Sequence, residues 1–321
     1  AGAEALATVC APTAFTLGFN RGALHPVLAA GTPEQKERFI AELLAQRGYA
    51  SLCLTEPEIS GSNLLGLQTT ARRTASGWVI NGTKCMVGQG SVASLYLVLA
   101  RTEVDGVSRG PSFFVVPRTE AVQVGPNTDK LGFRCVETPE VRFLGAEVGD
   151  EYRIGAMGSG AELMLDTLAA IRVGGASVIL GIVIGALQEV VPWLEGREVY
   201  GGPLIQKSHV QLELGGFFAR ALSIRTTIRK AALARQQGKP YGTDAAVAKL
   251  HAATLAVEAT SRIAQLYGWQ GIDGDYPIQK RFRDARQTPI FEGTSEVQKL
   301  NLFREMRRRL RTLRPKSSAL S

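Results

Sequence analysis

The spacing of apolar and polar positions changes twice along the chain, which divides it into three regions. Residues 1–49 have helical spacing, with Thr32 as a candidate N-cap and Pro33 in the first turn of a helix. In residues 50–145, short β-branched and aromatic runs alternate with turn residues, as in consecutive strands. Long helical spacing returns from residue 156 to 313. The predicted order is therefore helices, strands, helices.

The central region predicts an antiparallel arrangement. The run 78–80 precedes Asn81-Gly82, a pair typical of two-residue hairpin turns, and the run 84–87 follows it. Further strands are expected at residues 95–100, 112–116 and 140–143. Because no helical segment separates these runs, they indicate an antiparallel sheet or barrel. No G-x-G-x-x-G follows a strand, so the sequence lacks a nicotinamide-binding fingerprint.

The C-terminal region predicts a four-helix bundle, because long helical segments are joined there by short loops. These segments cover residues 160–194, 204–236, 243–268 and 295–312. The fold class is therefore α+β. We expect a partial N-terminal helical domain in residues 1–49, a β-domain in 50–150, and a helical bundle with a basic tail in 151–321.

Charge and composition exclude several classes of protein. The net charge is +8, but residues 304–321 alone hold +6 of it, so the basic character lies in a tail and indicates no nucleic-acid partner. The longest apolar run, residues 173–187, has 15 residues and contains glycines, which favours a buried helix over a membrane span. Four widely spaced cysteines and three histidines have no metal-ligand spacing, so we expect no metal site. The cysteine usage and the Arg-rich composition favour the cytoplasm of a bacterium.

A first candidate segment for chemistry is the loop of residues 54–63, which follows a predicted strand. Thr55, Ser60 and Ser62 supply hydroxyl groups, and Gly61 lets the backbone approach a ligand closely. Such a loop suits a large polar heterocycle or a phosphate. A plain Ser/Gly turn explains the same residues equally well.

The second candidate segment is Phe291-Glu292-Gly293-Thr294-Ser295-Glu296. Thr294 or Ser295 would cap the helix that follows, and Gly293 permits unusual backbone angles. Glu292 stands beside apolar residues, which raise the pKa of a carboxyl group and suit a general base. Taken alone, the pattern slightly favours the other explanation, that Glu292 only serves helix electrostatics.

Together the two segments, in this order and with a β-region between them, resemble the acyl-CoA dehydrogenase flavoprotein family. The first loop is similar to the family's A-L-T-E-P-x-A-G-S-D. Residues 276–286 and 290–298 are similar to Y-P-V-E-R-x-x-R-D-A-K and I-Y-E-G-T-S-E-I-Q. Further matches are Asn81-Gly82-Thr83-Lys84, residues 129–134, and residues 197–203 against R-x-x-F-G-x-P. The resemblance covers roughly residues 30–308.

The resemblance implies FAD as cofactor and an acyl thioester as substrate. Glu292 matches the catalytic base, which takes the α-proton while the β-carbon delivers hydride to flavin N5. The implied flavin contacts on the same chain are Leu54, Thr55, Gly61, Ser62, Met86, Gly88, Thr294 and Glu296. Arg197 and Tyr200 would reach the FAD of a partner chain, and Gln265, Gly268 and Trp269 would line its adenosine end. The implied substrate contacts are Ser62, Arg172, Phe291 and Gly293.

Some positions depart from the family pattern. Met86 and Gly88 stand where the family carries a Trp and a Thr, and Trp269 replaces the second Gly of a pair. Arg172 is present, but Ala169 replaces an Asp that helps to bind coenzyme A. This change predicts an acyl group, including a 2-hydroxyacyl group, carried on an acyl carrier protein.

The alternatives are an ordinary acyl-CoA α,β-dehydrogenase and a flavin oxidase, monooxygenase or non-catalytic relative. The resemblance further implies an electron-transfer flavoprotein as acceptor and a homodimer or homotetramer. Family members have more helices before the segment that matches residues 30–49, so we expect the N-terminal helical region here to be incomplete.

Overall fold

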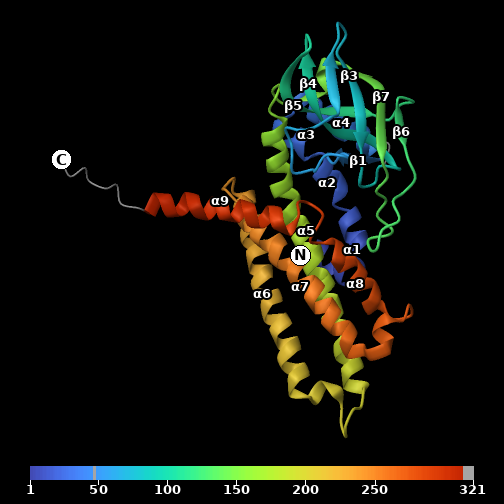
Figure 1. The fold of residues 1–321 in the computed structure, drawn as a ribbon, viewed down its shortest axis with the longest axis vertical. Coiled ribbons are helices and arrows are strands. Elements are labelled where there is room, and N and C mark those ends of the chain that lie inside the picture. The colour runs from blue at the N-terminus through green and yellow to red at the C-terminus, as the bar shows by residue number, and fades with distance from the viewer. Residues whose placement is uncertain (46–47, 314–321) are drawn as a thin grey trace, which may run out of the picture. The chain divides into compact units, whose positions relative to one another are not determined.

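A computed structural model describes residues 1–45 and 48–313 (Figure 1). Packing groups the chain into two compact units, one formed by residues 10–171 and one by residues 1–9 with the chain from Arg172 onward. Residues 10–49 therefore pack in the same unit as the strands, whereas the expected division separated them. The end of the expected basic tail, residues 314–321, lies outside the described residues.

The first helix connects the two units. Helix α1 (Gly2–Thr16) is bent at Cys10, which has extended angles of φ −145° and ψ 98°. Three helices follow in the unit that contains the strands: α2 (Phe19–Ala23), α3 (His25–Ala30) and α4 (Pro33–Ala45). Helix α4 begins as predicted: the Gln35 amide donates to Thr32 Oγ1 (3.2 Å), and the Thr32 amide donates to Gln35 Oε1 (2.9 Å).

The strands form one eight-stranded sheet in the order β6-β7-β3-β2-β4-β5-β8, with β1 also paired to β4. Their bounds are β1 (Tyr49–Cys53), β2 (Thr70–Arg73), β3 (Trp78–Lys84), β4 (Ala93–Val104), β5 (Val107–Pro117), β6 (Val122–Val124), β7 (Val141–Val148) and β8 (Arg153–Ile154). The pairing is antiparallel except that β4 runs parallel to β1 and β2. The sheet is therefore mixed, whereas the run of short strands suggested antiparallel pairing throughout.

The predicted hairpin at Asn81-Gly82 is wrong, because both residues lie inside β3. The chain turns earlier, where the Thr74 amide donates to the Gly77 carbonyl (2.9 Å). Gly82 has φ +149°, and a Cβ there would come within 2.6 Å of the Thr69 Cα. This glycine therefore serves a close approach of two backbones, which a local turn signal cannot distinguish from a hairpin.

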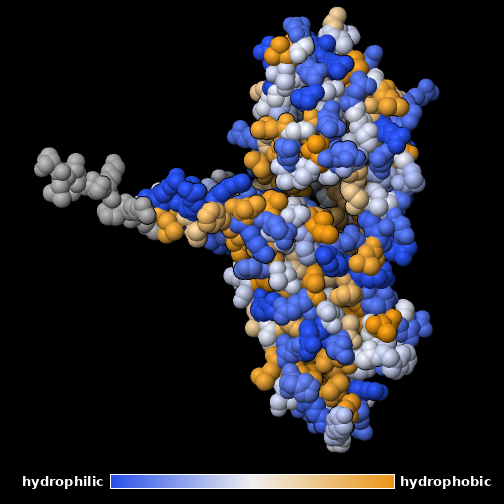
Figure 2. All heavy atoms as spheres, in the orientation of Figure 1, coloured by the Kyte–Doolittle hydropathy of each residue, from blue (hydrophilic) through white to orange (hydrophobic). Residues whose placement is uncertain are grey.

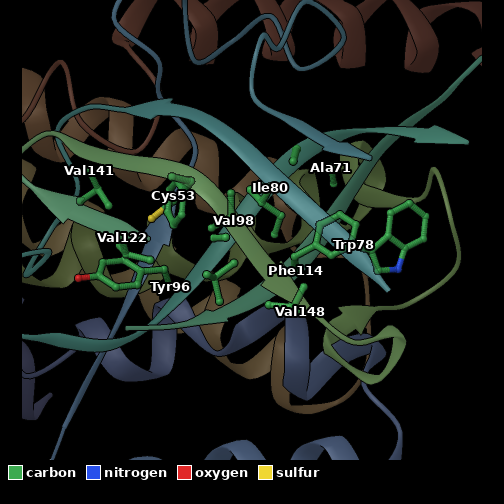
Figure 3. Packing of buried hydrophobic residues seen from close by; sticks show 14 of the residues in the cluster. Cys53, Ala71, Trp78, Ile80, Tyr96, Val98, Phe114, Val122, Val141 and Val148 are labelled. Carbon is green, nitrogen blue, oxygen red and sulfur yellow. The ribbon is translucent and has the colours of Figure 1, made fainter. Parts of the chain in front are cut away.

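Each face of the sheet carries its own core. Along β4, Leu95, Leu97 and Leu99 join a cluster that includes Phe39 of α4. The alternate residues of β4 belong to a second cluster, shown in Figure 3 with Trp78 and Phe114. Both clusters are fully buried at their centres, so β4 is a central strand covered on both faces.

The second unit is helical. It contains α5 (Gly160–Gly196) from Arg172 onward, α6 (Ser208–Gln236), α7 (Gly242–Tyr267), α8 (Pro277–Gln287) and α9 (Ser295–Leu313). Figure 1 shows α6, α7 and α8 alongside the second half of α5, whereas α9 projects away from them. The sequence interpretation missed α8 and placed the last segment within the bundle. The predicted bounds of the other helices agree with the structure to within a few residues.

Helix α5 confirms that the longest apolar run is a core helix. It is long and apolar enough to cross a membrane by length and composition alone, but 67% of its most apolar window is buried inside the protein. Two of its glycines, Gly181 and Gly185, face α1: a Cβ on Gly181 would come within 2.5 Å of Ala7 Cβ. The small residues thus let two helices pack closely.

Candidate active site

The loop between α8 and α9 places Glu292 in a constrained backbone conformation. Glu292 has φ 55° and Gly293 has φ +91°, so two consecutive residues adopt left-handed angles. Glutamate rarely adopts such angles, and such strain persists only where the surroundings fix the backbone. Thr294 starts α9 as predicted, because its Oγ1 accepts a hydrogen bond from the Val297 amide (3.3 Å).

The Glu292 side chain lies against a helical glycine. A Cβ on Gly175 of α5 would come within 2.8 Å of Glu292 Cδ and 3.0 Å of Oε1, so the absence of a side chain there makes room for the carboxyl group. Among the described residues, Oε2 is buried and has no hydrogen-bond partner. Burial raises the pKa of Glu292 to about 8, although the positive charges of Lys249 and Arg172 oppose the rise.

Two buried cations hold consecutive backbone carbonyls at this residue. Arg172 of α5 donates from Nε to the Glu292 carbonyl (3.0 Å), and Lys249 of α7 donates from Nζ to the Gly293 carbonyl (2.8 Å). Gln298 of α9 donates to the same Gly293 carbonyl (3.2 Å). Burial lowers the pKa of Lys249 to about 8, while the Glu292 charge acts against this shift. Three helices therefore fix the loop.

Lys249 and Gln298 are the residues that the sequence interpretation missed. Lys249 lies among buried alanines of α7 (Ala245, Ala248, Ala252 and Ala253) and is itself fully buried. A lysine on the apolar face of an amphipathic helix is the signal that could have identified it. Its partner is 44 residues away in sequence, so no local motif joins them.

The first predicted segment lies in the other unit, and a buried ion pair fixes its start. Lys84 Nζ donates to Glu56 Oε1 (2.9 Å) and to the Leu54 carbonyl (3.0 Å). The Glu56 carboxylate also accepts from the amides of Gln68 (2.7 Å) and Thr69 (3.0 Å). Burial of the ammonium is therefore offset by a charged partner and a carbonyl. The loop of residues 54–63 is therefore fixed where it begins, at Leu54 and Glu56.

The rest of this loop is open to solvent. Ser60 and Ser62 are exposed and hydrogen-bonded to each other through their hydroxyls (2.8 Å), and the Cys85 amide donates to the Thr55 carbonyl (2.8 Å). A Cβ on Gly61 would come within 3.1 Å of Thr55 Oγ1. Exposed hydroxyl groups on a loop with an anchored first residue suit a polar ligand.

Met86 and Gly88 follow β3 in the same unit as this loop. Met86 has φ 54° and a side chain that is 49% exposed. A Cβ on Gly88 would come within 2.6 Å of Phe19 Cζ, so the Phe19 ring occupies the direction in which a side chain would project. A hydroxyl-bearing residue at position 88 would have to displace this ring.

The residues expected to meet a partner's cofactor lie elsewhere in the helical unit. Arg197 and Tyr200 precede α6, and the set Gln265, Gly268 and Trp269 lies where α7 ends. Figure 1 shows both places at the end of the helices opposite to the loop before α9. Tyr200 is 96% exposed and Trp269 is 66% exposed. Within the described helical unit, these residues therefore lie apart from Glu292, and their contact with a second chain stays a prediction.

The residues present fit a flavin dinucleotide. FAD offers phosphates, a ribityl chain with hydroxyls and two planar ring systems. The exposed hydroxyls of Ser60 and Ser62 match the polar parts. Gly88 is the departure, because Phe19 stands where the resemblance expects a hydroxyl.

Comparison with known proteins agrees with this chemistry. Residues 51–145 match the family model "Acyl-CoA dehydrogenase, middle domain", and residues 158–307 match "Acyl-CoA dehydrogenase, C-terminal domain". A short-chain-specific acyl-CoA dehydrogenase of Clostridium acetobutylicum is 34% identical over 92% of this chain and 79% of its own length.

Solved structures extend the likeness to the fold. Butyryl-CoA dehydrogenase from Megasphaera elsdenii has a TM-score of 0.90 and 31% identity over 95% of this chain and 80% of its own. An acyl-CoA dehydrogenase from Bacillus anthracis in complex with FAD has a TM-score of 0.88 at 24% identity, over 97% of this chain and 56% of its own. The chain therefore belongs to the acyl-CoA dehydrogenase family, whose cofactor is FAD.

Proposed function

We propose that this protein oxidises the Cα–Cβ bond of an acyl-CoA thioester, with Glu292 as the catalytic base. The buried Oε2 of Glu292, which has no hydrogen-bond partner among the described residues, carries this proposal. An oxygen without a donor is free to accept a proton. The similarity to short-chain-specific relatives supports a short acyl group as the first substrate to test.

In the proposed mechanism Glu292 removes the α-proton, which becomes acidic only when negative charge on the thioester carbonyl is stabilised. We expect the Glu292 amide to donate to that carbonyl oxygen. The loop of residues 54–63 would help to hold FAD, which would supply the acceptor for the hydride equivalent from the β-carbon. Arg172 and Lys249 keep the loop in place while the carboxyl group passes from charged to neutral. Phe291 and Gly293 flank the base, so they would contact the acyl group closest to the reacting carbons.

The test is a spectrum of the purified, FAD-loaded protein before and after addition of butyryl-CoA and longer acyl-CoA thioesters. We expect anaerobic loss of the yellow flavin absorbance in the wild type. Glu292→Gln keeps the shape of the side chain and removes the base, so it should retain FAD but lose the bleaching. Bleaching of this variant at the wild-type rate would refute the assignment of the base.

A carrier-protein thioester is the second candidate substrate. Ala169 favours it, because the residue lacks the carboxylate that the resemblance expects for coenzyme A. In this structure Arg172 is only 6% exposed and donates to the Glu292 carbonyl, so its role at the loop accounts for its presence without a carrier. Turnover of one acyl group on coenzyme A and on a carrier protein separates the two candidates. A strong preference for coenzyme A excludes the carrier.

The proposed partners are an electron-transfer flavoprotein as acceptor and a second copy of this chain. The projecting α9 carries exposed apolar side chains (Leu300, Phe303, Met306 and Leu310). Figure 2 shows orange surface along this helix. Tyr200 is exposed in the same unit. A homodimer or homotetramer would cover these surfaces and bring Arg197 and Tyr200 to a neighbouring FAD. Light scattering of the FAD-loaded protein tests this, since a monomer that retains FAD tightly contradicts it.

A further inference from the structure

We propose that Lys249 is a positioning residue whose ammonium group fixes the backbone beside Glu292 and keeps Glu292 available as a carboxylate. This inference rests on the proposed function of Glu292 as a base. It adds a second helix, α7, to the machinery of the reaction.

Lys249 contacts both residues that flank Glu292 in the sequence. Its Nζ donates to the Gly293 carbonyl (2.8 Å), which follows Glu292. The same Nζ lies 5.7 Å from the ring centroid of Phe291, which precedes Glu292. The side chain is fully buried. Both neighbours of the base are therefore held by one cation.

A buried ammonium group is energetically costly unless an opposite charge lies nearby. The charged groups around Lys249 therefore indicate its role. The charged groups that face it are Glu292 on the loop, Arg172 on α5 and Glu296 at the start of α9. Glu296 is exposed and Arg172 carries a like charge. The buried carboxyl group of Glu292 is thus the negative charge with which Lys249 interacts inside the protein, and each charge stabilises the other.

We infer that the positive charge of Lys249 acts on Glu292 in addition to the hydrogen bond that Lys249 donates to the Gly293 carbonyl. A neutral donor would hold the Gly293 carbonyl as well, without the cost of burying an ion. Because burial raises the pKa of Glu292, its carboxyl group is less ionised at neutral pH than that of an exposed glutamate. Removal of a nearby positive charge would raise that pKa further. Each additional unit reduces the carboxylate fraction about tenfold at neutral pH.

The experiment compares Lys249→Met, which removes donor and charge, with Lys249→Gln, which keeps an amide donor and removes only the charge. The readout is the pH dependence of flavin reduction by the acyl-CoA that the wild type uses. We expect both variants to move the midpoint upward by about one unit, with about a tenfold loss of rate at pH 7. Lys249→Met should lose more rate than Lys249→Gln at saturating pH.

Lys299→Met is the matched control, because Lys299 is exposed on α9. We expect it to leave both rate and midpoint unchanged. An unchanged midpoint in Lys249→Gln would overturn the inference, since a merely structural role lowers the rate without moving the pH profile. If Lys249→Met fails to fold, Lys249→Gln alone decides.

A second readout separates this inference from the proposed function. The protein is labelled with ¹³C-glutamate, and the carboxyl resonance that is missing from the spectrum of Glu292→Gln is assigned to Glu292. The pH titration of this resonance requires no substrate. If no acyl thioester reduces the flavin but Lys249→Gln still shifts this titration upward, the coupling stands and the proposed reaction fails. An unshifted titration overturns the role of Lys249 whatever the activity.

Discussion

Gly175→Ala should reduce catalysis without weakening the fold. The new Cβ would stand 2.8 Å from Glu292 Cδ, where ordinary contacts begin at 3.4 Å, and the Oε2 atom lies closer still. The carboxyl group must therefore move by about 1 Å. A displacement of this size costs about 10²-fold in rate, or about 2.7 kcal/mol in activation free energy.

Stability should change in the opposite direction. Alanine is a better helix former than glycine by about 0.5–1 kcal/mol, and the atom that must move is at the flexible end of a glutamate side chain. The melting temperature of the variant should therefore be equal to or above that of the wild type. Loss of activity together with an unchanged fold distinguishes displacement of the base from unfolding.

Gly174→Ala is the matched control. Gly174 is the preceding residue of α5, and a Cβ there would meet nothing within 4 Å. It should give the same gain in helix stability and a wild-type rate. The assay is stopped-flow loss of flavin absorbance under anaerobic conditions, with thermal melting of the same samples. A wild-type rate in Gly175→Ala would show that the carboxyl group does not react from its position against α5.

Two further results are expected. The rate of flavin reduction should rise with pH around a midpoint near 8, because burial raises the pKa of Glu292 to about 8 and only the carboxylate accepts a proton; a flat profile between pH 6 and 9 would contradict this. Lys84→Met should lower the free energy of unfolding by about 3–5 kcal/mol and weaken FAD retention, because it leaves the Glu56 carboxylate buried without its cation. Chemical denaturation and the ratio of flavin to protein absorbance measure these effects, and unchanged FAD retention would show that the anchor of the loop does not serve the cofactor.

The features that the sequence predicted well are those set by local chemistry. The start of α4 was predictable because Thr32 and Pro33 act within one turn of the chain. Helix α5 was predictable because its apolar run exceeds what a strand accommodates. The position of Glu292 before a helix start was predictable because Thr294 is a capping residue. Its role as a base, however, came from resemblance, since the residues alone favoured an electrostatic role.

The features that the sequence did not predict depend on contacts between distant segments. Gly82 has the local signature of a turn, yet its φ of +149° serves the close approach of Thr69, the residue before the neighbouring strand β2. The charge of Lys249 has meaning only beside a loop 44 residues further along the chain. The parallel pairing of β4 with β1 and β2 likewise reflects the order of strands across the sheet, which the hydrophobic pattern of one strand does not contain.

The way the two cations are used explains how one carboxyl group can be both fixed and reactive. Arg172 and Lys249 donate to the carbonyl oxygens of Glu292 and Gly293, and within the described residues neither forms an ion pair with the carboxylate itself. A direct ion pair would lower the pKa of Glu292 and occupy the oxygen that must accept a proton. Attachment through the backbone holds the residue in its left-handed conformation and leaves Oε2 without a donor. The positive charges then act on the carboxylate at a distance, which moderates the effect of burial without removing the basicity on which the proposed proton abstraction depends.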